Sequence, residues 1–152
     1  MTISQKTAWA QLAIFGALVI GWAVLFALNG TIFYWQDETM KMTFYWLCTA
    51  AFATLVITNI VASILKGRLK AVTDERDKAI FRKASLLATG VSYSVVAALL
   101  LALAITYMDS GSETVPVYFP PFIVIVGGVT LLLTQAITAL LLYGRKVKHA
   151  ES

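Results

Sequence analysis

The residues most able to do chemistry form one polar run, Asp74-Glu75-Arg76-Asp77, which lies shortly before a long apolar segment. Three carboxylates within four residues could bind a divalent cation weakly. Arg76 lies among them, however, and the spacing is not that of a calcium-binding loop, so we expect no dedicated metal site. The run could instead form a docking or sensing surface for a cation, a lipid headgroup or a cytosolic partner.

A purely structural interpretation of the same run competes with the functional one. Thr73 is a suitable N-cap, and the acids after it occupy the first turn, where they oppose the positive end of the helix dipole. Asp74 and Lys78 form an i, i+4 pair in the favourable order. The sequence leaves both interpretations open. The residues of the candidate docking surface are Asp74, Glu75, Arg76, Asp77, Arg82 and Lys83.

Four apolar segments must position this run. Hydrophobic residues make up 59% of the chain and charged residues 13%. In soluble domains, apolar residues average about 45–50% and charged residues about 25%. Each segment lacks Asp, Glu, Lys, Arg and His, and each can cross a ~30 Å hydrocarbon layer, which takes about 20 helical residues. Pro120 and Pro121 belong at a helix start, which shortens the last segment. The predicted transmembrane helices are residues 8–28, 42–65, 84–108 and 121–144.

The polar connections between these segments alternate in charge. Residues 66–83 carry seven Lys and Arg and the C-terminal tail carries three, whereas residues 29–41 carry one and residues 109–120 carry none. The positive-inside rule then places both termini in the cytoplasm. We predict an all-α membrane protein: a single transmembrane domain of residues 1–152, folded as an up-down four-helix bundle. Its size and compact loops favour the prokaryotic inner membrane, and the net charge of +4 follows from topology rather than from nucleic-acid binding.

The third segment has an extension on the cytoplasmic side. Nothing breaks a helix between Asp74 and Met108, so we expect residues 74–83 to project from the membrane surface as part of the third helix. At the inner borders, Trp9 and Tyr143 are typical of the aromatic belt that forms at the headgroup level. We therefore predict that Tyr143 is an interface anchor.

Amides and hydroxyls are the strongest polar groups inside the predicted spans. We expect interhelical hydrogen bonds from most of them, because polar contacts and close packing hold helices together in lipid. A small polar cavity that binds a ligand is the alternative. The candidate intramembrane contacts are Asn59, Ser63, Thr130, Thr134, Gln135 and Thr138.

Small residues at four-residue spacing lie on one helix face and predict close packing between helices. Such a stripe could pack within the chain, or it could form the seam of a homodimer or of a complex with a partner subunit. The stripe of the first segment is Ala13, Ala17 and Gly21, and that of the third is Gly90, Ser94, Ala98 and Ala102.

Several function classes lack the residues they need. His149, in the tail, is the only histidine and Cys48 the only cysteine, which excludes haem ligation within the helices and cysteine-pair redox chemistry. The spans hold no ionisable residue of the kind that proton-coupled exporters use. Neither a catalytic triad nor a phosphate loop nor a zinc-binding pattern is present, so we expect no enzyme and no cofactor.

Residues 74–84 also carry a resemblance to a known group of proteins. Asp74-Glu75-Arg76-Asp77, followed by Ile80 and Lys83-Ala84 at the entry to an apolar helix, resembles the hallmark of a family of small predicted membrane proteins of unknown function. Those proteins have a similar four-helix layout and place the motif before the third helix. The resemblance implies no activity, but it draws attention to residues 74–77.

The leading hypothesis is a non-enzymatic accessory or regulatory subunit that contacts a protein partner or anionic lipid through a helix at residues 73–84. Seven basic and three acidic residues between positions 66 and 83 favour attraction to anionic headgroups. One alternative is a small dimeric transporter or channel for an ion or neutral solute, with its pathway along the hydroxyl stripes. A second alternative is a structural or lipid-binding membrane protein.

Overall fold

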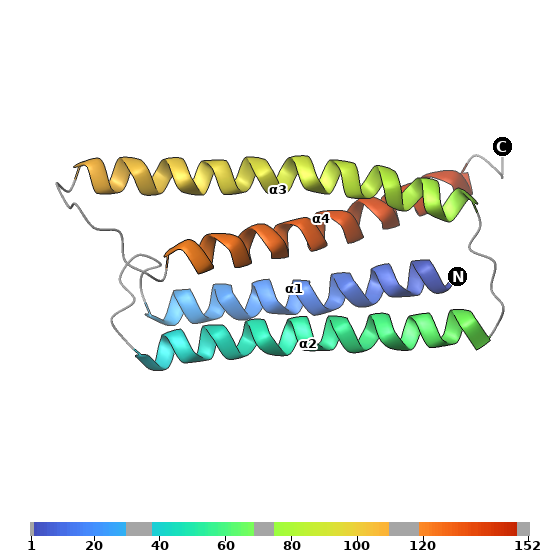
Figure 1. Ribbon diagram of the computed structural model, residues 1–152, viewed down its shortest axis with the longest axis horizontal. Coiled ribbons are helices and arrows are strands. Elements are labelled where there is room, and N and C mark those ends of the chain that lie inside the picture. Colours follow the sequence, from blue (N-terminus) through green and yellow to red (C-terminus); the bar gives the residue numbers. More distant parts are fainter. Residues whose placement is uncertain (1, 30–37, 69–74, 110–118, 149–152) are drawn as a thin grey trace. The chain divides into compact units, whose positions relative to one another are not determined.

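The computed structural model describes residues 2–29, 38–68, 75–109 and 119–148, and nearly all of these residues are helical. Figure 1 shows the four helices of this part of the chain. They are α1 (Ile3–Asn29), α2 (Glu38–Arg68), α3 (Glu75–Asp109) and α4 (Phe119–Lys148). The prediction of an all-helical chain with four membrane-spanning segments is confirmed to this extent: each helix is long and apolar enough to cross a membrane.

The surfaces of these helices are those of a chain that is solvated by lipid. The apolar windows have mean hydropathies of 2.0 to 2.2, yet only 6% to 28% of their residues are buried. Many large aliphatic side chains therefore point outward, and Leu28 and Met108 are 80% and 81% exposed. In water such a surface would drive aggregation, whereas in hydrocarbon it costs nothing.

The ends of α3 and α4 follow from simple backbone chemistry. The acid-rich start of α3 is continuous with its apolar part, so one helix of 35 residues runs from Glu75 to Asp109. Helix α4 begins at Phe119, two residues before the predicted start, and takes Pro120 and Pro121 into its first turn. The first N–H groups of a helix have no acceptor within it, so prolines are tolerated there.

The chain divides into two compact units, of which the first holds α1 and α2. These two helices pack as an antiparallel pair, mainly through aromatic rings. Trp22 stacks on Phe44 with ring centroids 5.0 Å apart, and Phe15 meets Phe52 edge-on at 5.5 Å. The buried positions of α1 recur at alternating spacings of four and three residues, which is the pattern of a helix that buries one stripe. They are Ser4, Ala8, Gln11, Phe15, Leu18 and Trp22.

The second unit holds α3 and α4, which also run antiparallel and meet at three depths. Asp77 bonds Tyr143 at one end, and Tyr107 packs edge-on against Phe119 at the other. Between them, the Ser92 hydroxyl donates a hydrogen bond of 2.8 Å to the Gly127 carbonyl. Ser92 and Gly127 thus form a hydrogen bond between helices, and this is the kind of contact that lipid-embedded helices rely on.

Most residues of the two predicted small-residue stripes are exposed, so they do not pack within their own units of the chain; their use as the seam of a homodimer or of a complex with a partner stays a prediction. Ala13 and Ala17 are exposed, and so is the whole predicted stripe of α3, where Ser94 bonds the Gly90 carbonyl of its own helix. Helix α3 instead turns a second small stripe toward α4, two positions away from the predicted one. That stripe is Ala84, Ala88 and Ser92, and the larger Val96 continues it.

Gly127 generates a prediction, because a Cβ atom at this position would lie 2.7 Å from Cγ2 of Val96. The branched valine cannot easily turn away, so we expect Gly127→Ala to reduce the free energy of unfolding by about 1–3 kcal/mol. Gly90→Ala is the matched control, since a Cβ atom there meets nothing within 4 Å and alanine favours helix by up to about 1 kcal/mol. Denaturant titration of the purified protein in detergent measures both. Equal stability of the two variants would contradict the close approach.

Candidate functional site

Asp77 stands apart from the other charged residues at the start of α3, because it is buried. Its side chain is only 6% exposed, and its Oδ1 accepts a hydrogen bond of 2.8 Å from the hydroxyl of Tyr143, which is 7% exposed. A carboxylate removed from water needs such a partner, since an unpaired buried charge is costly. The bond joins two residues that are 66 positions apart and ties the first turn of α3 to the end of α4.

Arg76 and Lys83 lie beside this contact and line a small hollow. Its other lining residues are Ala79, Ile80 and, from α4, Leu142, and its volume is about 160 Å³. The four residues from α3 follow the i, i+3, i+4, i+7 spacing of one helix face. The hollow is therefore a groove at the edge of the α3–α4 seam, with two cationic side chains and an apolar floor.

Glu75, Lys78 and Arg82 lie on the face of α3 that is turned away from Asp77 and the seam. They are exposed, and they follow each other at i, i+3 and i+7, so they form one mixed-charge row. None of the three lines the hollow, although Ala79, which does, is a neighbour of Glu75 and Arg82 on the helix surface. We call these three residues the outer row.

The described residues of the predicted docking surface therefore do not form one surface, because their side chains point in three different directions around α3. Asp74 lies outside the described residues. Glu75 and Arg82 belong to the outer row, Arg76 and Lys83 line the hollow, and Asp77 points inward to Tyr143. Sequence reasoning missed Tyr143, which it placed at the interface for its ring, although a phenol that ends a span can also donate a hydrogen bond to an acid on the next helix.

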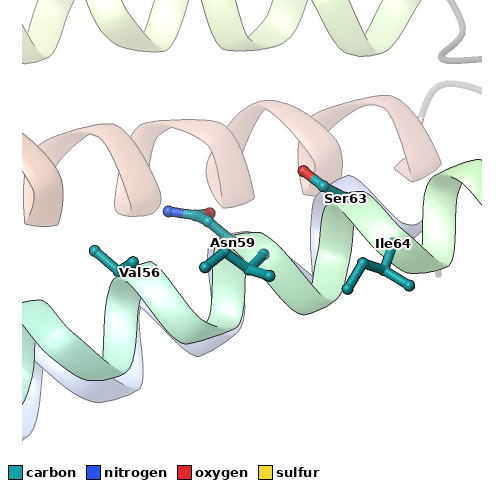
Figure 2. Close-up of a pocket in the computed structure, with 5 residues that line it drawn as sticks. Val56, Asn59, Ser63 and Ile64 are labelled. Atoms are coloured by element: carbon teal, nitrogen blue, oxygen red, sulfur yellow. The ribbon is translucent and has the colours of Figure 1, made fainter.

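The predicted intramembrane contacts lie on α2 and α4. Figure 2 shows the Asn59 and Ser63 side chains on one side of α2, where they line an open hollow of about 380 Å³ together with Val56, Ile60 and Ile64. All five residues come from one helix, so the hollow is a surface groove. The α4 candidates Thr130, Thr134, Gln135 and Thr138 are half-buried. Their interhelical hydrogen bonds stay a prediction.

Other hydroxyls of α2 bond their own helix. Thr54 donates to the Ala50 carbonyl at 2.7 Å, and Thr58 donates to the Thr54 carbonyl at 2.8 Å. A hydroxyl that bonds four residues back needs no neighbouring helix. Within the described part of the chain, no group of three or more His, Cys, Asp or Glu side chains could hold a metal ion.

Comparison of the chain with protein-family models, with curated proteins and with solved structures finds no match. These comparisons therefore assign neither a family nor an activity. The resemblance carried by residues 74–84 stays a prediction, and any function must be argued from the side chains themselves.

The Asp77–Tyr143 hydrogen bond can be tested directly. Tyr143→Phe removes the donor and leaves the buried carboxylate without it, so we expect a loss of about 1–3 kcal/mol in the free energy of unfolding. Tyr93→Phe in the same unit is the control; Tyr93 is 73% exposed, and the change should stay within about 0.5 kcal/mol. In a double-mutant cycle, Tyr143→Phe should cost less when Asp77 is already Ala, which has no acceptor for the hydroxyl. If the losses in the free energy of unfolding of the two single variants simply add in the double variant, the hydrogen bond contributes nothing to stability.

Proposed function

We propose that this protein is a non-enzymatic accessory or regulatory subunit of the inner membrane, which docks a partner through the start of α3. The observation that carries the proposal is the Asp77–Tyr143 hydrogen bond together with the outer row on the other side of the same turns. The bond anchors the first turn of α3 to α4. The outer row is therefore presented on a fixed helix rather than on a mobile loop.

A fixed surface suits docking because little conformational entropy is lost when a partner binds. The outer row also carries both signs of charge: Glu75 is acidic, whereas Lys78 and Arg82 are basic. A surface of mixed sign selects a partner by the pattern of charges, since like charges placed opposite each other cost several kcal/mol. A lipid leaflet has no such pattern, so we assign the outer row to a protein partner.

The proposed topology places this surface in the cytoplasm. Eleven of the twelve Lys and Arg residues fall in segments that an up-down bundle would put on the same side as both termini. The lysine and arginine bias of short loops sets the orientation of membrane helices. The start of α3, at the end of the most basic connection, would then face the cytosol.

Orientation is tested with single cysteines in intact cells and a membrane-impermeant maleimide. With Cys48 replaced by Ala, we expect Thr39→Cys at the start of α2 to react from outside. Lys6→Cys should react only after the membrane is permeabilised, because it lies on the cytoplasmic side. The reverse pattern would overturn the orientation and would place the start of α3 outside.

Docking is tested by swapping charges without changing their number. Glu75→Lys combined with Lys78→Glu keeps the net charge but reverses the pattern of the outer row. The protein is purified from native membranes in mild detergent, and co-eluting proteins are identified by mass spectrometry. We expect the swap to reduce recovery of a stoichiometric partner by at least about tenfold.

The chain supplies a matched control for this experiment. Glu38 and Lys41 have the same i, i+3 spacing in the first turn of α2, on the proposed outer side of the membrane. Glu38→Lys with Lys41→Glu should leave recovery unchanged. Equal effects of the two swaps would refute a specific outer-row contact. If the unmodified protein elutes alone, the subunit proposal fails, and flux of ions or solutes in reconstituted vesicles becomes the next measurement.

A further inference from the structure

We propose that the hollow lined by Arg76, Ala79, Ile80, Lys83 and Leu142 binds an anionic phospholipid, with its phosphate held between Arg76 and Lys83. The inference rests on the proposed function, since it uses the same helix and orientation, and it adds the chemical class of a ligand. It concerns the edge of the α3–α4 seam, whereas docking of a protein concerns the outer row.

The two cations line the same hollow. They lie seven residues apart, which is about two turns and about 10 Å along one helix face. A ligand that occupies the hollow between them can therefore contact both long side chains. The arginine fork can bond two phosphate oxygens at once, and the lysine ammonium adds a point charge.

The described acids of the same turns do not line the hollow. Asp77 is turned into the seam, where Tyr143 bonds it, and Glu75 lies on the face of α3 that is turned away from the seam. Arg76 and Lys83 are the charged residues among those that line the hollow, and both are cationic. Their charge favours an anion there, although the run as a whole contains both signs.

The size and floor of the hollow point to a lipid rather than to a soluble anion. Its volume of about 160 Å³ is below the range of about 300–1,000 Å³ that drug-sized ligands occupy, so a nucleotide does not fit. Ala79, Ile80 and Leu142 offer an apolar wall, which an acyl chain can use and which inorganic phosphate cannot.

The depth of the hollow agrees with this ligand. Lys83 is followed directly by Ala84 and by the long apolar part of α3. The hollow thus lies where the charged start of the helix gives way to its membrane-spanning part. That is the headgroup level, where basic residues attract the anionic lipids of the cytoplasmic leaflet.

The test measures lipid binding to the full-length protein by native mass spectrometry in mild detergent, with added phosphatidylglycerol, phosphatidylcholine or inorganic phosphate. We expect bound phosphatidylglycerol with the unmodified protein, and at least about tenfold weaker binding with Arg76→Gln combined with Lys83→Gln, because both charged contacts to the phosphate are lost. Lys78→Gln combined with Arg82→Gln is the control. It removes the same charges, one arginine and one lysine, from the outer row and should bind as the unmodified protein does.

A second variant separates a shaped site from simple charge attraction. Ala79→Phe fills the hollow and keeps both cations, so it should also weaken phosphatidylglycerol binding. The inference is overturned if both double variants weaken binding equally, if Ala79→Phe has no effect, or if phosphatidylcholine or inorganic phosphate binds as well as phosphatidylglycerol. Partner recovery is scored in the same preparations. If the unmodified protein retains its partner but binds phosphatidylglycerol no better than phosphatidylcholine, the lipid site is refuted and the docking proposal stands.

Discussion

Hydrocarbon offers no hydrogen-bond partner, and the other features of these helices follow from that constraint. Every backbone N–H and C=O group in a span must be paired within the protein, so the spans are helices. Side-chain hydroxyls obey the same rule: Thr54 and Thr106 each donate to the carbonyl four residues back. Two such helices are held together by close packing of their backbones and by the few polar side chains that form hydrogen bonds to the neighbouring helix. In the second unit both occur at one place, where Ser92 bonds the carbonyl of Gly127, a residue without a side chain to keep the helices apart.

The Asp77–Tyr143 bond determines the rotation of α3 about its axis at the end that carries the charges. Once Asp77 faces α4, the helical repeat places Arg76 and Lys83 at the edge of the seam and places Glu75, Lys78 and Arg82 on the face turned away from the seam. The separation of a cationic hollow from a mixed-charge row is thus a consequence of one contact. A structural helix start and the proposed recognition surface are competing interpretations of the sequence, but the structure makes them compatible, because different residues of the same turns would serve each.

The positions of the spans could be predicted because length and hydropathy dominate in lipid, and α1 to α4 lie where the apolar segments are. The rotation of the helices could not be predicted in the same way. Helix α3 carries two small-residue stripes, beginning at Gly90 and at Ala84, and composition does not distinguish them. The choice depends on Gly127 and Tyr143, which are distant in sequence. The sequence predicts an interface position for Tyr143, because aromatic rings are common at the ends of spans. The residues around Tyr143 in the sequence do not identify the acid to which its hydroxyl donates a hydrogen bond.

Placing a charged side chain within a membrane span costs several kcal/mol, whereas at the headgroup level the cost is small. The charged side chains of the chain are therefore expected at the helix ends. Specific recognition by charge is therefore confined to short stretches such as the start of α3. On that stretch the hollow and the outer row consist of different side chains, so a lipid and a protein partner would not compete for them. A lipid bound at the seam would add contacts between α3 and α4 beside the Asp77–Tyr143 bond. Lipid binding would in this way hold the outer row steadier for its partner, and the composition of the membrane would regulate docking.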